Sequence, residues 1–587
     1  MNIKGGDFLI NKTNPSAVFI PENWNEEQIM LKDMIHNFLE KELHHLSEEP
    51  KATKDLDFIV KLLDKSAELG LCGIAIESKY GGIDLDFNTG LLYTEAMARG
   101  FSFATTIGAH VSIGSLPIVY YGNEEQKKKY LPKIATAVLK TAYALTEPNA
   151  GSDANSGKTK AIIDKKNNQY LITGQKMWIT NAGFADIFIV FAKIEDDKNL
   201  SAFIVERNFD GITFGEEEKK LGIKGSSTRQ VFFTDCPVPM ENLLGDRDSG
   251  FKIALNILNS GRIKLAAGAV GGSKFALKKA VNYSIERKQF DQSICNFTAI
   301  QHKMGEMIRK IFAAESAVYR IGRNIDKKES ELKEKKCPEN EIKLKALREF
   351  AIECALMKVY SSEVLDFCVD EALQIYGGMG YSTEAGVEMG YRDARITRIY
   401  EGTNEINRML AFGELIKRGF QTKELNLKSA GKKIPTALIK RYFKIGKLTA
   451  ENVIQNYKYL FLLLSKYAAD SFGLDLEHEQ EIIMNLSDIM GETYVAESVF
   501  LRVEKIKLQK GNSIDLEHKE NLKRLQLYEA NLKIVHCANT IVDSLPDTKN
   551  KLLRLYIRLL TPQPILNPTK IRRSLAKYII EKKDYPW

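Results

Sequence analysis

The chain has 587 residues, which is too many for a single hydrophobic core and indicates two or more domains. Hydrophobic residues at 44% and charged residues at 27% are the values of an ordinary globular protein. The net charge of +8 is spread along the chain, and no strongly basic stretch with interleaved aromatics indicates nucleic acid as a partner. A mild basic excess suits a polyanionic small ligand or an anionic membrane surface.

Cysteine usage and apolar runs indicate the compartment. The seven cysteines are scattered and no Cys-x-x-Cys occurs, which predicts a reducing compartment without a disulfide frame or a structural metal site. The sequence starts without the apolar core of a signal peptide, and its first arginine is Arg99. Apolar runs such as Tyr459–Leu464 are far shorter than a membrane span. We therefore expect a cytoplasmic protein.

Helical periodicity predicts an α domain over residues 1–142, followed by a β domain over residues 143–245. Apolar residues recur at three- and four-residue spacing from Asn25 onward. Further helices of this domain are expected over Leu56–Leu69, Leu91–Ala98 and Glu124–Val138. Short β-branched and aromatic runs then predict strands over Gln169–Thr173, Asp186–Ala192, Leu200–Val205 and Gln230–Thr234.

Long helical patterns return near Phe251 and predict a second α domain over residues 246–420. Its helices are expected over Phe251–Glu286, Ala299–Asp326, Leu344–Tyr376 and Glu405–Arg418. Residues 421–587 are again helical by pattern and form an extension. The predicted fold class is mainly α with a central β domain and a helical C-terminal extension.

Two segments of the β domain have the residue types of a ligand site. The loop Tyr143–Asp153 can aim backbone N–H groups and the hydroxyls of Thr146 and Ser152 at a planar polar ligand. A plain connecting loop has the same composition. In Lys176–Gly183, Trp178 can stack on a ring while Thr180 bonds its edge, and the alternative is a buried strand tryptophan.

Two segments of the second α domain suit phosphate groups. Arg287 and Phe290 are three residues apart on a predicted helix, and such a pair suits a pyrophosphate beside an aromatic base. The glycines of Gln374–Gly380 permit close backbone approach to a phosphate or ribityl chain. This segment is not a dinucleotide fingerprint, because a long helical pattern precedes it and no βαβ unit surrounds it.

Glu401 stands at the end of a basic segment of mixed polarity and is followed at once by Gly402. A carboxylate next to a glycine can lie where a ligand touches the backbone, because glycine has no side chain to block the approach. Neither residue alone indicates a particular reaction.

Together and in this order, these segments resemble the acyl-CoA dehydrogenase family. The resemblance rests on the loop 143–153, Met177–Asn181, Arg287–Phe290, Gln374–Gly378 and Arg392–Thr403. It covers about Asn25 to Arg418 and implies that family's fold, which is an α-bundle, a β-barrel-like domain and a second α-bundle. Ala109–Gly114 and the long extension are similar to the very-long-chain branch.

The resemblance implies FAD as the cofactor and assigns contacts by position. The flavin would be lined by Tyr143, Leu145, Thr146 and Ser152 and covered by Trp178 and Thr180. The pyrophosphate and adenosine would be held, partly from a neighbouring subunit, by Arg287, Phe290, Gln374 and Gly378. Thr403 and Glu405 would contact FAD after the catalytic loop, although family members often differ at the position of Glu405. Acyl-CoA would meet Ser152, Asn259, Arg262 and Gly402.

By the same resemblance, Glu401 matches the family's usual base. Isovaleryl-type members carry their glutamate at the position of Gly261, so this rival base is absent here. The implied reaction is α,β-dehydrogenation of acyl-CoA to trans-2-enoyl-CoA in fatty acid β-oxidation. Glu401 would take the C2 proton in a dry pocket, where the basicity of a carboxylate rises, and the flavin N5 would accept a hydride from C3.

Substrate length, partners and two rival functions stay open. If Ala104–Ala109 forms the pocket floor, its small residues leave depth for a medium-to-long acyl chain, whereas close helix packing explains them equally well. The resemblance implies electron-transferring flavoprotein as acceptor and a homodimer, with a homotetramer as the alternative. The basic segment Thr436–Lys447 either lies on a membrane surface or docks on the core. The rival functions are an acyl-CoA oxidase that uses oxygen and a flavoprotein with an assembly or scaffold role.

Overall fold

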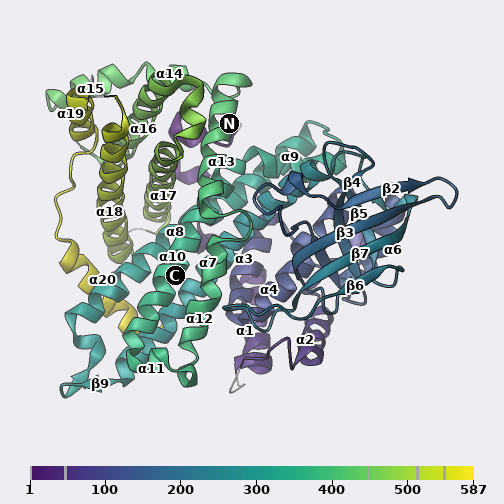
Figure 1. The fold of residues 1–587 in the computed structure, drawn as a ribbon. Helices are drawn as coiled ribbons and strands as arrows, with labels where there is room; N and C mark the ends of the chain where they lie inside the picture. Colours follow the sequence, from purple (N-terminus) through teal and green to yellow (C-terminus); the bar gives the residue numbers. More distant parts are fainter. Residues whose placement is uncertain (1–2, 45–48, 447, 511–513, 547–549) are drawn as a thin grey trace. The chain divides into compact units, whose positions relative to one another are not determined.

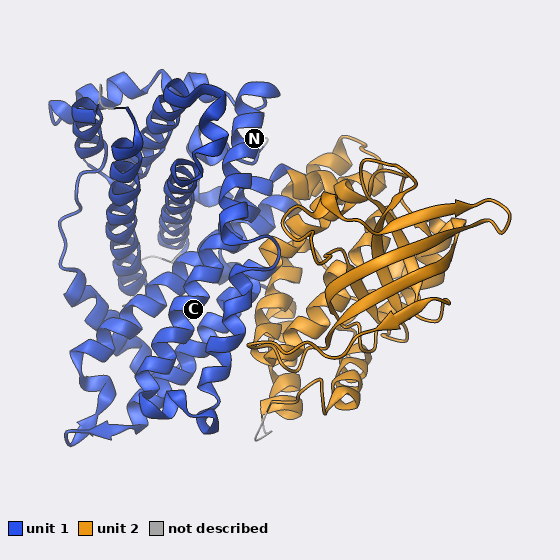
Figure 2. Cartoon of the chain, viewed as in Figure 1, with its two compact units in different colours: residues 1–25, 265–325, 349–587 blue, residues 26–264, 326–348 orange. Residues whose placement is uncertain are grey.

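The computed structural model of the chain describes residues 3–44, 49–446, 448–510, 514–546 and 550–587 (Figure 1). These residues form two compact units (Figure 2). Unit 1 consists of residues 1–25, 265–325 and 349–587, and unit 2 consists of residues 26–264 and 326–348. The predicted β domain therefore lies in unit 2, whereas Glu401 and the extension lie in unit 1.

The helices at the start of unit 2 are α1 (Glu26–Leu39), α2 (Leu56–Glu68), α3 (Phe87–Met97), α4 (Ser102–Ala109), α5 (Leu116–Tyr121) and α6 (Glu124–Ala135). They agree with the predicted periodicity at α1, α2, α3 and α6, whereas α5 was not predicted. The start of α6 is fixed by a capping box, in which Asn123 and Gln126 exchange side-chain and backbone hydrogen bonds.

Among the described residues, the stretch Ser102–Tyr121, which includes α4 and α5, has the length and the hydropathy of a membrane-spanning helix. Its burial is that of a core segment, because 78% of it lies inside the protein. The sequence reading missed it because polar residues such as His110 interrupt the run. Burial lowers the pKa of His110 to about 4, so the imidazole is neutral at pH 7. Its Nδ1 accepts a hydrogen bond from the N–H of Thr141 at 3.2 Å.

An eight-stranded sheet follows in the order β6-β7-β3-β2-β4-β5-β8, with β1 paired to β4. Its strands are β1 (Thr141–Ala144), β2 (Lys160–Asp164), β3 (Gln169–Thr180), β4 (Ile187–Ile194), β5 (Ser201–Glu206), β6 (Ile212–Phe214), β7 (Thr228–Pro239) and β8 (Leu243–Leu244). Strand β4 pairs in parallel with β1 and β2, and it is buried on both faces. Ile189 packs with the residues of α5 and α6, whereas Val190 packs with those of β5 and β7.

The remaining helices belong to unit 1, except that α7, α8 and α9 contribute residues to both units. The helices before the extension are α7 (Gly250–Glu286), α8 (Thr298–Glu334), α9 (Glu339–Glu349), α10 (Ala351–Tyr376), α11 (Gly378–Tyr381), α12 (Val387–Ala394) and α13 (Asn404–Ile416). The extension contains α14 (Leu427–Gly431), α15 (Ile434–Tyr442), α16 (Ala450–Phe472), α17 (Gln480–Lys510), α18 (Ile514–Ser544), α19 (Asn550–Leu560) and α20 (Pro568–Lys582).

One predicted helix is divided in the structure. Leu344–Tyr376 was expected to be continuous, but Phe350 leaves the helical conformation with φ −104° and ψ 25° and separates α9 from α10. Next to this break, the backbone carbonyl of Glu349 accepts a hydrogen bond from Arg418 at 2.7 Å. A contact between residues so distant in the sequence leaves no local periodic signal.

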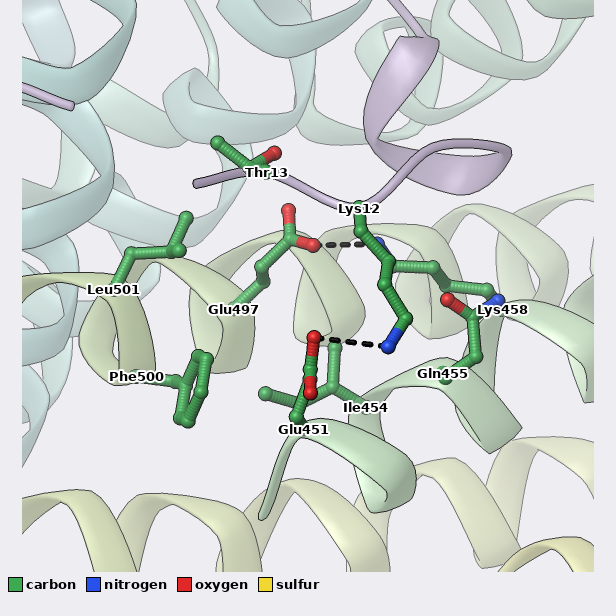
Figure 3. A pocket seen from close by; sticks show the side chains of 9 residues that line it. All are labelled: Lys12, Thr13, Glu451, Ile454, Gln455, Lys458, Glu497, Phe500 and Leu501. Atoms are coloured by element: carbon green, nitrogen blue, oxygen red, sulfur yellow. Dashed lines mark hydrogen bonds and ion pairs between the residues drawn. The ribbon is translucent and has the colours of Figure 1, made fainter. Parts of the chain in front are cut away.

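Residues 3–25, which we call the strap, lie along helices of the extension. Lys458 of α16 donates to the carbonyl of Asn11 at 2.9 Å, and Lys505 of α17 donates to that of Val18 at 2.6 Å. A small pocket lies between the strap, α16 and α17 (Figure 3). Its volume of ≈ 10 Å³ is at the lower limit for holding one water molecule. It is lined by Lys12, Thr13, Glu451, Ile454, Gln455, Lys458, Glu497, Phe500 and Leu501.

Buried carboxylates of unit 1 predict an acid limit to stability. Burial alone would raise the pKa of Glu22, but Arg502 and Lys519 override burial and lower the pKa to about 2. Because the unfolded side chain titrates near its ordinary pKa of 4.5, this stabilisation is complete above pH 4.5 and is lost as the pH falls toward 2. We expect the thermal unfolding midpoint, followed by circular dichroism, to fall across this range. Glu22→Gln should make that fall shallower, and an unchanged acid dependence would contradict the assignment.

Candidate active site

The loop residues that were predicted to line the flavin follow β1 of unit 2. Tyr143 lies in β1, Leu145 is buried just after it, and Ser152 is exposed further along the loop. The backbone carbonyl of Thr146 accepts a hydrogen bond from the N–H of Met177 at 2.9 Å. This bond places the start of the loop beside β3, so two segments that the sequence singled out separately are adjacent within unit 2.

Trp178 is presented to solvent by a bulge in β3. The β3–β7 register shifts between Lys176, which pairs with Val231, and Ile179, which pairs with Arg229. Trp178 has a φ of 56°, and 59% of its surface is exposed. Bulges re-aim side chains near active sites, and a left-handed non-glycine residue is strained. The alternative of a buried strand tryptophan is therefore wrong, while Thr180 ends the strand in a half-buried position.

A buried ion pair fastens this loop to β3, and the sequence reading missed it. Lys176 is fully buried, and its Nζ lies 2.7 Å from Oε1 of Glu147. Burial lowers the pKa of Lys176 to about 8, although Glu147 opposes the shift. The pKa of Glu147 stays below its ordinary value because Lys176 outweighs the burial that would raise it. Both groups are thus charged at pH 7, and Glu147 also accepts from the N–H groups of Lys158 and Thr159 at 2.6 and 3.1 Å.

Two of the residues predicted to meet acyl-CoA, Asn259 and Arg262, lie on the part of α7 that belongs to unit 2. Asn259 and Arg262 are both buried, and Nη1 of Arg262 donates to Oδ1 of Asn259 at 2.7 Å. Their three-residue spacing places them on one helix face. Gly261 lies between them on the buried part of the helix and brings no carboxylate.

In unit 1, Arg287 and Phe290 do not share a helix face, so that part of the prediction is wrong. Helix α7 ends at Glu286, and β9 (Lys288–Gln289) and β10 (Gln292–Ser293) form a hairpin. Its turn residues, Phe290 and Asp291, have φ of 52° and 61°, as a two-residue type I′ turn requires. Arg287 is exposed before the hairpin, and Phe290 is 86% exposed at its tip.

The glycine segment after α10 lies at the same end of unit 1 as this hairpin. The rings of Tyr283 on α7 and Tyr376 on α10 stack at 3.9 Å, so the two helices end side by side. Figure 1 labels β9 and α11 at this end. Gln374 is exposed, and a Cβ added at Gly378 would meet no atom within 4 Å. The two phosphate-type segments are therefore brought together within unit 1.

Glu401 and Gly402 form a left-handed turn that precedes α13. Their φ angles are 57° and 81°, and both residues are half-buried. Thr403 is the N-cap, and its Oγ1 accepts from the N–H of Ile406 at 3.3 Å. Glu405 follows in the first helical turn and is exposed. The carboxylate of Glu401 therefore projects from a constrained backbone rather than from a free loop. Loss of hydration, and then the charge of Glu401, raise the pKa of Tyr400 above its ordinary value.

Two buried side chains that the sequence reading missed, Lys358 and Asn407, hold this turn. Lys358 of α10 donates to the carbonyl of Gly402 at 2.7 Å and to Oδ1 of Asn404 at 2.9 Å. Nδ2 of Asn407 donates to the carbonyls of Glu401, Gly402 and Thr403 at 3.2, 2.8 and 3.0 Å. A lysine within the apolar run Ala355–Tyr360 was the signal that could have indicated such a role.

Within unit 1, the turn and the phosphate-type end are far apart. Lys358, which contacts the turn, and Gln374 are both on α10, and their separation corresponds to a rise of about 24 Å along the helix. One copy of unit 1 therefore presents two separate groups of candidate residues.

The order of these segments matches the order of known domain models. The models for the N-terminal, middle and C-terminal domains of acyl-CoA dehydrogenase match residues 25–137, 142–236 and 248–414. A further acyl-CoA dehydrogenase C-terminal domain model matches residues 456–558, within the extension. The chain belongs to the acyl-CoA dehydrogenase family. It is therefore an FAD-dependent oxidoreductase that dehydrogenates acyl-CoA.

Individual relatives and one solved structure add to this comparison. A probable acyl-CoA dehydrogenase of Bacillus subtilis is 42% identical over 86% of this chain and 85% of its own length. The human very long-chain specific acyl-CoA dehydrogenase is 39% identical over 62% of this chain, and the match spans 57% of that enzyme. A crystal structure of an acyl-CoA dehydrogenase complexed with FAD from Bacillus anthracis aligns over 100% of both chains, with a TM-score of 0.95 and 39% identity.

Proposed function

We propose that this acyl-CoA dehydrogenase oxidises medium-to-long-chain acyl-CoA to trans-2-enoyl-CoA in fatty acid β-oxidation, with Glu401 as the base. The observation that carries the proposal is the turn itself. By the sequence resemblance, Glu401 matches the family's usual base, and in the structure its backbone is fixed by the buried donors Lys358 and Asn407. Removal of a weakly acidic proton needs a carboxylate held in a defined direction, because general base catalysis depends on geometry first and on pKa second.

Besides the base, the reaction needs only a few groups of the protein. The C2–H and C3–H bonds break and a C2–C3 double bond forms. Glu401 receives the proton from C2, and FAD, when bound, supplies the acceptor for the hydride from C3. By the family resemblance, the backbone N–H of Glu401 itself, together with a ribityl hydroxyl of bound FAD, stabilises the negative charge that develops on the thioester oxygen. Gly402 lets the thioester lie against the backbone next to the base, because it has no side chain.

The residues that would hold FAD fit its chemistry. Trp178 offers an exposed aromatic face and Thr180 a hydroxyl, beside the loop of Tyr143, Leu145, Thr146 and Ser152. Arg287, Phe290, Gln374 and Gly378 offer a cation, a ring, an amide and a bare backbone, which suit a pyrophosphate and an adenine. We assign Thr403 and Glu405 to FAD as well, and Asn259 and Arg262 to CoA.

Anaerobic mixing with acyl-CoAs of increasing length tests the reaction. The flavin absorbance should bleach on mixing with substrate, and the rate should depend on acyl length. Rapid formation of peroxide without an added electron carrier would instead support an acyl-CoA oxidase. A protein that binds FAD but does not bleach with any acyl-CoA would support the assembly or scaffold role.

The length preference is supported by open space next to α4. A Cβ added at Gly108 on α4, or at Gly90 on α3, would meet no atom within 4 Å. Close helix packing does not explain these two glycines, because a packed glycine has neighbours where its Cβ would be. The open space favours a substrate with a long acyl chain.

Filling that space should shorten the accepted substrate. We expect Gly108→Leu to lower kcat/KM for palmitoyl-CoA by at least about 10-fold relative to butyryl-CoA, because a single methylene in an apolar pocket already changes this ratio about 10- to 200-fold and leucine adds four carbons. Gly431→Leu is the matched control, because Gly431 on α14 also has open space at its Cβ position and lies in unit 1. An equal loss for both substrates in the Gly108 variant would contradict the assignment.

We propose a homodimer that uses the hairpin end of unit 1, and electron-transferring flavoprotein as the acceptor. Phe290 and Tyr381 are 86% and 85% exposed there, beside Arg287 and Gly378. Exposed large apolar side chains around candidate ligand groups support a contact between copies. Sedimentation of Phe290→Asp tests the dimer, and this variant should be monomeric. Transfer of electrons from reduced enzyme to purified flavoprotein tests the acceptor.

We further propose that α15 contacts an anionic membrane surface. Ile434 is buried and docks the helix, whereas Ile439, Tyr442 and Phe443 are exposed next to Lys440 and Lys444. Lys447, at the end of the predicted basic segment, lies outside the described residues. Cosedimentation with vesicles that contain phosphatidylserine should be lost in Phe443→Glu.

A further inference from the structure

The Glu401–Gly402 turn needs an external support. Glu401 adopts a φ of 57°, and left-handed backbone is unfavourable for a residue with a Cβ. Gly402 continues in the same region, with a φ of 81°. The strain at Glu401 persists only where surrounding groups fix the backbone, so the partners of these peptide groups decide where the Glu401 side chain lies.

Those partners are side chains of α10 and α13. The carbonyls of Glu401, Gly402 and Thr403 all accept from Asn407, and that of Gly402 also accepts from Lys358 at 2.7 Å. Because a peptide unit is planar, fixing a carbonyl oxygen also fixes the direction of the N–H on its other side. The Cα of Glu401, from which the carboxylate extends, is thereby held in one orientation.

Burial of the Lys358 ammonium at this place costs free energy. Lys358 is completely buried on α10, and taking an ammonium out of water is unfavourable unless its hydrogen bonds are replaced. Two of its hydrogen bonds go to the turn region, to the Gly402 carbonyl and to Oδ1 of Asn404. Asn404 is itself held by Ser362 of α10, with Nδ2 donating to Oγ at 3.1 Å. The rigid helix α10 therefore transmits its position directly to the turn.

We propose that Lys358 is a positioning residue for the dehydrogenation, which aims the Glu401 carboxylate by holding the Gly402 carbonyl. Lys358 acts through the backbone and touches neither substrate nor FAD. The proposal rests on the proposed role of Glu401 as the base. It assigns to an interior helical lysine a role in the rate of proton removal that differs from a contribution to folding.

The test separates rate from stability. Lys358→Met keeps an unbranched apolar side chain that is one atom shorter, and it removes the hydrogen-bond donors. We expect the rate of anaerobic flavin bleaching to fall about 10- to 100-fold, the loss expected for a misplacement on the order of 1 Å. FAD content and KM should stay at wild-type values. Lys458→Met is the matched control, because Lys458 is equally buried in unit 1 but bonds Asn11 and Glu497. It should lower the melting temperature and leave the rate per bound FAD unchanged.

A second readout isolates proton removal. In a 3-thia-acyl-CoA, sulfur replaces C3 and no hydride can leave, so exchange of the C2 proton with D₂O reports the base alone. This exchange should slow in Lys358→Met by the same factor as bleaching. Asn407→Ala, which acts on the same carbonyls, should show the same loss and replaces Lys358→Met if that variant does not fold.

Two results have different meanings. If the variants bind FAD and exchange the C2 proton at the wild-type rate while Glu401→Gln does not, the role of Lys358 is overturned and Glu401 remains the base. If Glu401→Gln itself exchanges normally, the assignment of the base fails first.

Discussion

Replacing Glu401 with glutamine is expected to lower the rate of flavin bleaching by palmitoyl-CoA about 10²- to 10⁴-fold, the usual contribution of a general base. The amide has the size and shape of the carboxylate but cannot accept the C2 proton. The turn should be unchanged, because Lys358 and Asn407 bind the backbone of residues 401–403 rather than the side chain. Anaerobic stopped-flow absorbance of the FAD-loaded variant measures the rate directly.

Glu414→Gln is the control for this experiment. Glu414 lies on the same helix, α13, and its carboxylate is 3.7 Å from Lys417 near the helix end. Its removal changes the charge of α13 equally and should leave the rate unchanged. Bleaching of Glu401→Gln at the wild-type rate, with full FAD content, would show that another group removes the proton.

The largest effect on stability is expected from Arg502→Met. Arg502 of α17 is fully buried, with its guanidinium 2.9 Å from Glu22 of the strap and 2.6 Å from Glu315 of α8. It also lies 4.0 Å from the ring centre of Phe312. Its removal leaves two buried carboxylates with one cation fewer, which costs about 3–5 kcal/mol when one partner of a buried pair is deleted. Denaturant unfolding of the FAD-loaded chain, followed by far-ultraviolet circular dichroism, measures the loss.

Lys507→Met provides the comparison on the same helix. Lys507 is exposed on α17, where it forms ion pairs with Glu520 of α18 and, at 3.3 Å, with Glu504. Exposed pairs contribute about 0–1 kcal/mol, so this variant should unfold close to the wild type. Equal unfolding midpoints for both variants would mean that the buried cluster around Arg502 does not stabilise unit 1.

The sequence predicted those helices and strands whose pattern of apolar residues is regular along their length. The long helix α7 was expected over Phe251–Glu286 and runs Gly250–Glu286, because its apolar periodicity is continuous. The buried strand β4 was likewise recognisable from its β-branched and aromatic residues. Both faces of β4 are covered, which explains why its sequence shows no alternation.

Features set by distant partners were missed. Trp178 is turned outward by a bulge that exists only because β7 pairs with β3 out of register. The residues around Phe290 read as a continuing helix, although two left-handed residues fold them into a hairpin. Lys358 reads as a single lysine in an apolar helix, and only the folded turn, 44 residues later, shows what its ammonium binds.

The route of the strap also has a consequence for synthesis of the protein. A ribosome makes residues 3–25 long before the helices that receive them. Glu22 precedes Arg502, its main ion-pair partner, by 480 residues, and Asn11 precedes Lys458 by 447. The strap therefore leaves the ribosome without these native contacts, while the sheet of unit 2, whose strands all lie between residues 141 and 244, can close much earlier. The path of the chain therefore determines the order in which the two units can be completed during synthesis.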